Sequence, residues 1–233
     1  MSATLTDRNV AILKIIVDEY IATGEVLWSK LLLKKYDLGV SPATVRNDMV
    51  QLEKLELIFQ PYNSAGRLPT SKWLRAFVNY LMGETPSHLL HAKNIDLGYQ
   101  NIKQFSDFSY KITYELAKTT WEIAFFVVPD QHVSQHAGIT QFLKTNRERL
   151  WESIYSIIDI LEDKFNFIKF IESLWLTSWV NVSIGEENIL PFLHDYTLII
   201  KPVHIDGDLA YVWLLGSLKM NYSFNISAIN GVL

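Results

Sequence analysis

Hydrophobic residues recur with helical spacing through the first quarter of the chain. A helix is expected over residues 7–22, with Thr6 as its N-cap and Gly24 as its C-terminal stop. A second helix is expected over residues 28–36. A third begins after Ser41, a capping residue, and has a proline at its first position, where no amide hydrogen is needed. Three short amphipathic helices in close succession therefore open the chain.

A different pattern follows the third helix. Residues 57–70 are expected to form two short strands, joined by a turn over residues 62–66 that ends in glycine. A closing helix is expected over residues 71–82. Three helices, a β-hairpin and a further helix are the order of a winged helix-turn-helix, a DNA-reading fold. Residues 1–83 are therefore predicted to form a winged-helix DNA-binding domain.

The rest of the chain mixes helical and strand-like segments. Residues 84–92 are expected to be a linker, and residues 93–233 to form a second, regulatory or dimerising domain. An amphipathic helix is expected there over residues 102–116 and another over residues 150–161, continued or followed by a further helix up to residue 175. Short apolar runs predict strands over residues 123–128, 180–184, 197–203 and 209–215, the last two joined by a tight Asp-Gly hairpin. The expected fold class is α+β with a mainly antiparallel sheet, and residues 130–135 are interpreted as a connector.

The third helix has an outward face that is unusual for a plain surface helix. Its apolar residues fall on one side, which leaves small and polar residues on the other. Arginine can bind guanine and asparagine can bind adenine through paired hydrogen bonds in the major groove. We therefore expect this face to read bases, through Ala43, Thr44, Arg46, Asn47 and Gln51.

Other polar residues of the first domain suit the DNA backbone. Ser41, Ser64, Arg67 and Lys30 are expected to hold phosphate groups, and Gly66 shapes the turn beside them. For Lys30 the alternative is an ordinary solvated charge. Asp48 would be repelled by phosphate, so we expect it to hold Arg67 or another cation of the domain.

Charge and composition change this picture little. The net charge of −4 divides into +2 over residues 1–83 and −6 over residues 84–233. DNA affinity would therefore depend on where the cations lie rather than on bulk charge. The chain has no cysteine, which excludes disulfides and thiol chemistry. It shows no signal peptide and no apolar run of membrane-spanning length, so a cytoplasmic protein without membrane contact is expected.

The sequence offers little for catalysis. His132 and His136 are four residues apart, which suits a metal on a helix face, but they lie in the expected connector without a third ligand. Asp206 and Asp208 flank a glycine and are interpreted as turn residues. No catalytic triad order, phosphate-cradling loop or dinucleotide fingerprint is present. We therefore expect no enzyme activity, no catalytic residues, no metal and no cofactor.

Several motifs resemble one family. SPATVRNDMVQLE over residues 41–53, QP at 60–61 and SAGRLPT over 64–70 resemble the heat-inducible transcription repressor HrcA family, and IGEEN over 184–188 and LGSLKMNYS over 215–223 are weaker matches. The resemblance implies a winged-helix domain followed by a GAF-like domain with an inserted dimerising domain. It further implies a homodimeric repressor of heat-shock (chaperone) genes that binds a double-stranded inverted-repeat operator and depends on the chaperonin.

The chain departs from that family pattern in one large respect. Only residues 130–135 stand where relatives carry the inserted dimerising domain and part of the GAF-like sheet, so the second domain is expected to be a reduced GAF-like domain. An inverted repeat needs two readers related by a two-fold axis. The first helix or the aromatic-rich helices after residue 100 are candidates for the dimer surface. The alternative function is a ligand- or chaperone-sensing interaction protein with weak or non-specific DNA binding.

Overall fold

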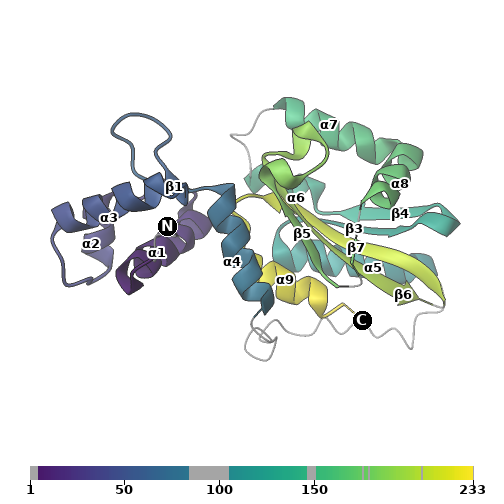
Figure 1. The fold of residues 1–233 in the computed structure, drawn as a ribbon. Coiled ribbons are helices and arrows are strands. Elements are labelled where there is room, and N and C mark those ends of the chain that lie inside the picture. Colours follow the sequence, from purple (N-terminus) through teal and green to yellow (C-terminus); the bar gives the residue numbers. More distant parts are fainter. Residues whose placement is uncertain are drawn as a thin grey trace. The chain divides into compact units, whose positions relative to one another are not determined.

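The structure of the chain is a computed structural model, which describes residues 5–83, 105–145, 151–174, 176–177, 179–205 and 207–232 (Figure 1). It divides into two compact units, Met1–Gly83 and Glu84–Leu233. The expected linker over residues 84–92 lies outside the described residues. We refer to the two parts as the first and the second unit and describe each by itself.

Over its described residues, 5–83, the first unit contains four helices and a small antiparallel sheet. In chain order its elements are α1 (Asp7–Thr23), α2 (Ser29–Lys35), α3 (Pro42–Lys54), β1 (Ile58–Phe59), β2 (Leu68–Pro69) and α4 (Ser71–Gly83). The caps expected for α1 are confirmed. The Thr6 side chain accepts a hydrogen bond from the Asn9 amide, and Gly24 ends the helix with φ 71° in the left-handed region.

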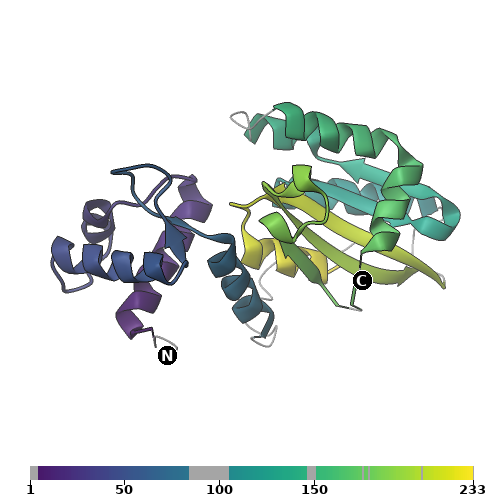
Figure 2. The same ribbon diagram turned by 45° about the horizontal axis from the view of Figure 1, so that its top comes forward.

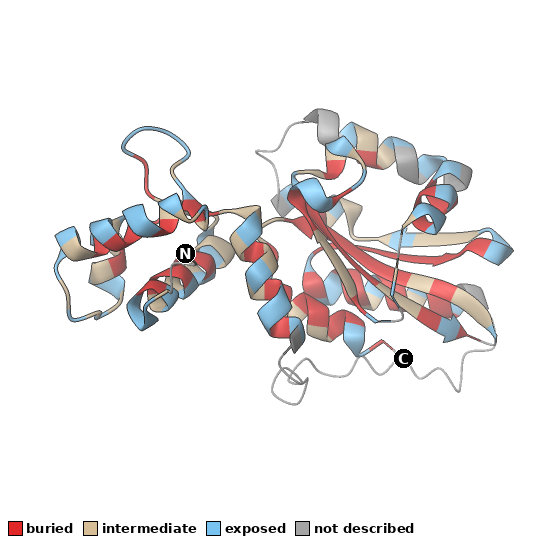
Figure 3. Cartoon of the chain, in the orientation of Figure 1, coloured by how far each residue is buried: buried red, intermediate tan, exposed pale blue. Residues whose placement is uncertain are grey.

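The helices of the first unit enclose one apolar core (Figure 3). Leucine and isoleucine side chains of α1 and α2 meet one face of α3, and Ile58 of β1 joins them. The inward face of α3 is the one expected from its periodicity, because Val45, Met49 and Leu52 are all buried. Burying these side chains fixes how α3 is rotated, and with it which residues face solvent.

The start of α3 is also as expected. Ser41 precedes the helix in extended conformation, and its hydroxyl accepts a hydrogen bond from the Thr44 amide at 3.1 Å. Pro42 occupies the first helical position, where it costs no hydrogen bond. The helix is therefore well defined at the end that carries most of the candidate base-reading residues.

The two strands of the first unit form a hairpin, by which we mean residues 58–69. Ile58 pairs with Pro69 and Phe59 with Leu68. The hairpin is tied to the chain before α2 as well, because Leu27 and Arg67 exchange backbone hydrogen bonds of 3.0 and 2.9 Å. Gly66 makes that approach possible, since a Cβ atom there would lie 2.7 Å from the Leu27 carbonyl carbon and oxygen.

The second unit is built on a five-stranded antiparallel sheet with strand order β4-β3-β7-β6-β5. The strands are β3 (Ile123–Val128), β4 (Val133–Ala137), β5 (Asn181–Ile184), β6 (Tyr196–Ile205) and β7 (Asp208–Ser217). The described helices of four or more residues are α5 (Phe105–Thr120), α6 (Ile139–Thr145), α7 (Trp151–Glu162), α8 (Lys164–Ser173) and α9 (Tyr222–Asn230). The expected mixed α+β class with an antiparallel sheet is thus confirmed.

Helices cover both faces of this sheet (Figures 1 and 2). On one face α6, α7 and α8 pack over Phe125 and Trp213, whose ring centroids are 4.3 Å apart. On the other, α5 and α9 lie against the sheet, with Phe108 of α5 edge-on to Phe126. Because both faces are covered, β3 is buried along its whole length, which explains its continuous apolar run.

One segment of the second unit differs from the sequence expectation. The connector expected over residues 130–135 is wrong, because Val133–Ala137 forms strand β4 and pairs antiparallel with β3. Only a single turn of 3-10 helix, Pro129–Gln131, and His132 with φ 51° separate the two strands. The sequence did not predict this strand because VSQHA is polar, and at the sheet edge its residues are mostly half-buried rather than buried like those of β3.

A carboxyl group is buried in the second unit without a cationic partner among the described residues. Glu122 is 9% exposed, and one carboxylate oxygen accepts a 3.4 Å hydrogen bond from the Asn225 amide group on α9. Burial raises the pKa of Glu122 to about 8, while the Asn225 hydrogen bond acts in the opposite direction. The Glu122 carboxyl therefore keeps its proton to a higher pH than an exposed glutamate does.

Candidate nucleic-acid interface

The solvent face of α3 carries the residues expected to read bases. Ala43, Arg46, Asn47 and Gln51 are exposed, and Thr44 is half-buried. In the part of the chain that the structure describes, no hydrogen bond or ion pair engages the side chains of Arg46, Asn47 or Gln51. Their donors and acceptors are thus free to meet a ligand from solvent.

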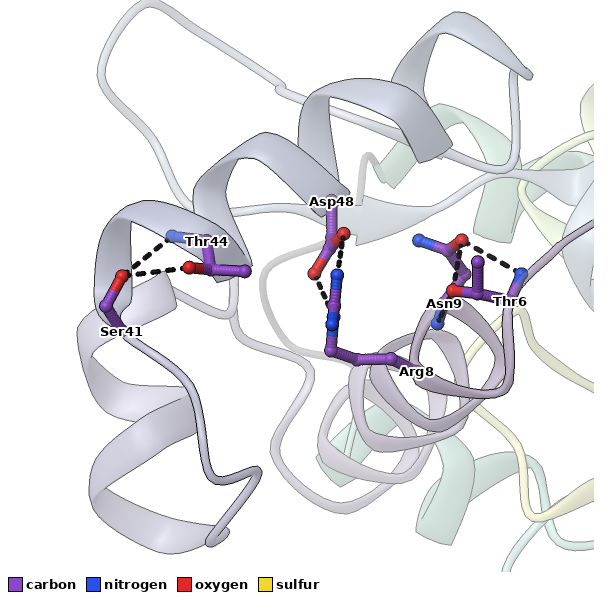
Figure 4. A network of polar contacts seen from close by, with 6 residues as sticks. All are labelled: Thr6, Arg8, Asn9, Ser41, Thr44 and Asp48. Carbon is purple, nitrogen blue, oxygen red and sulfur yellow. Dashed lines mark hydrogen bonds and ion pairs between the residues drawn. The ribbon is translucent and has the colours of Figure 1, made fainter.

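The acidic residue of α3 points the other way, toward α1 (Figure 4). Asp48 has a buried side chain, and its two oxygens accept hydrogen bonds of 2.7 and 3.1 Å from Nε and Nη2 of Arg8. The expectation that Asp48 holds a cation of its own domain is confirmed, and that cation is Arg8 rather than Arg67. The same bond raises the pKa of the Arg8 guanidinium. The negative charge is thereby kept away from the exposed face.

Ser41 and Thr44 satisfy each other at the helix start (Figure 4). Besides accepting from the Thr44 amide, the Ser41 hydroxyl lies 2.9 Å from the Thr44 hydroxyl. Each hydroxyl keeps some capacity for a further partner, since a hydroxyl has one donor and two acceptor sites. The arrangement makes both residues better suited to a backbone phosphate than to base discrimination.

Within the described residues, Arg46 lines two hollows of the first unit. The first, about 410 Å³, lies between the start of α2, α3 and the hairpin, and Gln60, Ser64 and Arg67 contribute to its wall. The second, about 520 Å³, is lined by residues of α2 that include Lys30 and Lys34. Both polar and cationic groups thus surround the exposed arginine.

Trp28 is a site residue that the sequence did not reveal. It lines both hollows beside Arg46 and is 45% exposed, although it is a large apolar side chain. In the sequence it stood only as the first residue of the helix expected over residues 28–36, a position that does not indicate which way its side chain points. An indole offers an apolar face for a sugar and an N–H donor for a phosphate.

The tip of the hairpin is exposed, but its arginine is not. Tyr62 is 65% exposed, and its carbonyl closes the turn by accepting from the Ala65 amide at 2.9 Å. Ser64, at φ 66°, is exposed at the same tip. Arg67 instead points inward, where Nη2 donates to Glu53 at 3.1 Å and Nη1 to the Ala65 carbonyl at 3.3 Å. Its side chain is only 15% exposed.

The expected site residues therefore separate into two groups. Those of α3, with Lys30 and Ser64, are exposed or half-buried, and Arg46 also lines both hollows. Gly66 and Arg67 line the first hollow as well, but Gly66 is buried and the Arg67 guanidinium is bonded within the unit. Among the described residues no three histidine or acidic side chains are grouped as a metal site requires. His132 lies in the turn before β4 and His136 on that strand.

The sequence of the chain matches a family described as HrcA protein C terminal domain over residues 74–226, about two thirds of its length. The chain belongs to the HrcA family. The heat-inducible transcription repressor HrcA of Thermobifida fusca is 39% identical over 125 residues, which are 54% of this chain and 36% of the relative. HrcA of Anabaena sp. (strain L31) is 46% identical over 112 residues, 48% of this chain and 30% of the relative. The matched part spans about a third of these HrcA proteins.

One solved structure resembles the chain along most of its length. It is the crystal structure of a hypothetical protein, with a TM-score of 0.76 at 20% identity, and it covers 97% of this chain and 95% of that one. At this identity the likeness supports the fold alone. Within the described residues, no helix is both long and apolar enough to cross a membrane.

Proposed function

We propose that this HrcA-family chain is a transcriptional repressor of heat-shock genes that binds double-stranded DNA through its first unit. The observation that carries the proposal is the solvent face of α3, where Arg46, Asn47 and Gln51 stand exposed without partners among the described residues. The only carboxylate of that helix's middle turn, Asp48, is neutralised on the opposite side by Arg8. An unengaged polar face cleared of negative charge suits the major groove.

The order of elements supports a winged helix-turn-helix. In that interpretation α2 and α3 form the helix-turn-helix, α3 enters the major groove, and the hairpin is the wing. Arg46 and Asn47 would contact base edges, with Ala43 permitting close approach and Gln51 extending the contact along the groove. Thr44 and Ser41 would flank the groove at the phosphate backbone.

The groups around the two hollows would hold the backbone. Ser64 at the hairpin tip lines the first hollow and Lys30 on α2 lines the second, so a DNA backbone in either hollow would meet a donor. We add two exposed aromatic residues to this group: Trp28, which lines both hollows, and Tyr62, which lies at the hairpin tip. Arg67 is proposed to position the hairpin through Glu53, with Gly66 providing the close approach to Leu27.

The test compares an inverted-repeat duplex that binds HrcA relatives with a scrambled duplex of the same composition. Arg46→Ala should weaken binding to the inverted repeat about tenfold to a hundredfold, and binding to the scrambled duplex much less, because a guanine contact contributes about 1–3 kcal/mol of discrimination. Lys30→Ala is the matched control and should weaken both about equally. Equal losses with Arg46→Ala would make that residue a backbone contact, and no selectivity in the wild-type chain would contradict the proposal.

We propose further that the chain acts as a cytoplasmic homodimer, that the chaperonin is a partner, and that the second unit is a reduced GAF-like regulatory domain. The alternative function is a ligand- or chaperone-sensing interaction protein with weak or non-specific DNA binding, and its small-molecule form has less support. The hollow between Phe125, Phe167 and Trp213 holds only about 10 Å³, which is room for at most a single water molecule. A thermal-shift screen in which one small molecule gives a large stabilisation would favour the sensor instead.

A further inference from the structure

The solvent side of α5 carries a stripe of aromatic side chains. Tyr110 and Tyr114 are 58% and 45% exposed, and Trp121, directly after the helix, is 61% exposed. The two tyrosine rings stack with centroids 5.9 Å apart, and Lys118 lies with Nζ 5.7 Å from the Tyr114 ring. The opposite side of α5 is already used, since Phe108 and others are buried against the sheet. The stripe is therefore a second apolar face on a helix whose first face is filled.

The spacing of the stripe is that of a helix–helix seam. Asp107, Tyr110, Tyr114, Lys118 and Trp121 follow one another at intervals of three or four residues, which places them along one line of the helix surface. A single exposed aromatic residue is ordinary, whereas a line of exposed aromatic residues along one helix is the kind of surface at which proteins contact one another.

Trp121 is not explained by the fold of its own turn. It has φ 65°, and its amide donates to the Ala117 carbonyl at 3.0 Å, which is the geometry of a left-handed helix stop. Glycine adopts this conformation without strain, whereas an aromatic residue is disfavoured there. The indole contributes little to the core, because Trp121 is 61% exposed.

The charges of the stripe indicate what covers it. Asp107 is exposed near the start of α5 and Lys118 is exposed near its end. If two copies of α5 pack antiparallel about a two-fold axis near residue 112, Asp107 of each copy lies opposite Lys118 of the other. The same axis sets Tyr110 opposite Tyr114 across the seam. A parallel pair would instead oppose like charges, so the pattern favours a two-fold, antiparallel arrangement.

We propose that the α5 stripe is the dimer interface of this chain, occupied by the same stripe of a second copy. The proposal rests on the proposed function for its purpose, because an inverted repeat needs two readers, but it is testable without DNA. A seam of one helix from each copy is at the small end of stable interfaces, so the dimer dissociation constant should be on the order of micromolar.

Sedimentation equilibrium of the whole chain, without DNA, is the test. The wild type should dimerise at micromolar concentrations. Trp121→Gly should weaken dimerisation at least about tenfold while leaving the thermal midpoint unchanged or higher, because glycine relieves the strained φ. Tyr155→Ala, which removes another exposed aromatic residue of the second unit, is the matched control and should leave the dimer unchanged.

A charge exchange tests the antiparallel register. Asp107→Lys and Lys118→Asp should each weaken dimerisation about tenfold, because each substitution occurs twice at a two-fold interface, and the double variant should restore it. A monomer at all concentrations, or a dimer indifferent to these variants, would overturn the proposal. Operator binding by the same samples distinguishes the dimer interface from the proposed repressor function. A dimer that depends on the stripe but does not bind the operator selectively counts against the proposed function alone.

Discussion

Arg8 of α1 holds Asp48 of α3 with two hydrogen bonds, one to each carboxylate oxygen. The two residues are forty positions apart in sequence, and Asp48 is nearly buried while Arg8 keeps 42% of its side chain exposed. A paired, two-point contact of this kind fixes the rotation of α3 about its own axis as well as its distance from α1. It thus helps to set which residues α3 presents to solvent.

Asp48→Ala should lower both stability and DNA affinity. Loss of the pair leaves Arg8 without its partner, and a thermal midpoint lower by on the order of 5 °C is expected. Arg8→Ala should have a similar effect, and the double variant should cost little more than either single one. Arg46→Ala is the control, since this exposed arginine should leave the midpoint unchanged. Additive effects of the two single substitutions would contradict the pairing.

Glu53 distinguishes two roles for Arg67. If Arg67 contacts DNA, removing Glu53 frees its guanidinium and removes a negative charge, so affinity should rise. If Arg67 anchors the hairpin, as its 15% exposure indicates, Glu53→Gln should lower affinity several-fold despite the more favourable charge. We expect the decrease, measured by fluorescence anisotropy on one duplex. Glu56→Gln, at an exposed residue paired with Lys72, is the control for charge alone.

Gly66→Ala should separate the hairpin from the chain before α2. A methyl group would lie 2.7 Å from backbone atoms of Leu27, so one of the two segments must move. We expect a loss of about 1–3 kcal/mol in the free energy of unfolding, the usual range for forced overpacking. Gly39→Asn is the control, because that position has open space and a φ of +64° that asparagine tolerates. Equal stability of both variants in urea titrations would show that the hairpin adapts.

The stability of the second unit should fall as pH rises from about 5 to 8. Glu122 has a folded-state pKa raised to about 8, so in this window the folded chain binds a proton that the unfolded chain has lost. Each pH unit then costs about 1.4 kcal/mol of the free energy of unfolding, as an order of magnitude. Glu122→Gln, a neutral isostere, should flatten this slope and be more stable than the wild type at pH 8.

The measurement is urea unfolding at several pH values between 5 and 9 for both proteins. Asn225 gives the substitution a further benefit, because its Oδ1 is buried without a partner in the described structure and a glutamine amide can donate to it. Parallel pH slopes for the wild type and Glu122→Gln would show that Glu122 does not cause the pH dependence.

Sequence patterns predicted most of the first unit because local rules decide it. Thr6, Gly24 and Ser41 mark helix ends through their own backbone preferences, and the apolar face of α3 follows from its period. The direction of Arg67 could not be predicted in this way. The same sequence is compatible with an Arg67 that points to solvent and with one that points inward. The direction depends on Glu53 of α3, which accepts a hydrogen bond from the Arg67 side chain in the folded unit.

In the second unit the failures share one physical cause. The strand over Ile123–Val128 was predicted to the residue because both its faces are buried, which makes it uniformly apolar. Strand β4 and helix α6 were missed because each is short and lies where tertiary contacts, rather than periodicity, define it. Trp28 of the first unit was missed for a related reason. Its place beside Arg46 depends on two hollows whose walls come from several elements, which no local sequence pattern reveals.

The backbone bridge between Leu27 and Arg67 has a consequence for the thermodynamics of recognition. Because the hairpin is hydrogen-bonded to the segment leading into α2, its tip and the exposed face of α3 belong to one rigid frame. The distance between the hairpin tip and the exposed face of α3 is then fixed before any ligand binds. Little conformational entropy remains to be lost on association, and affinity depends on whether the ligand matches that distance.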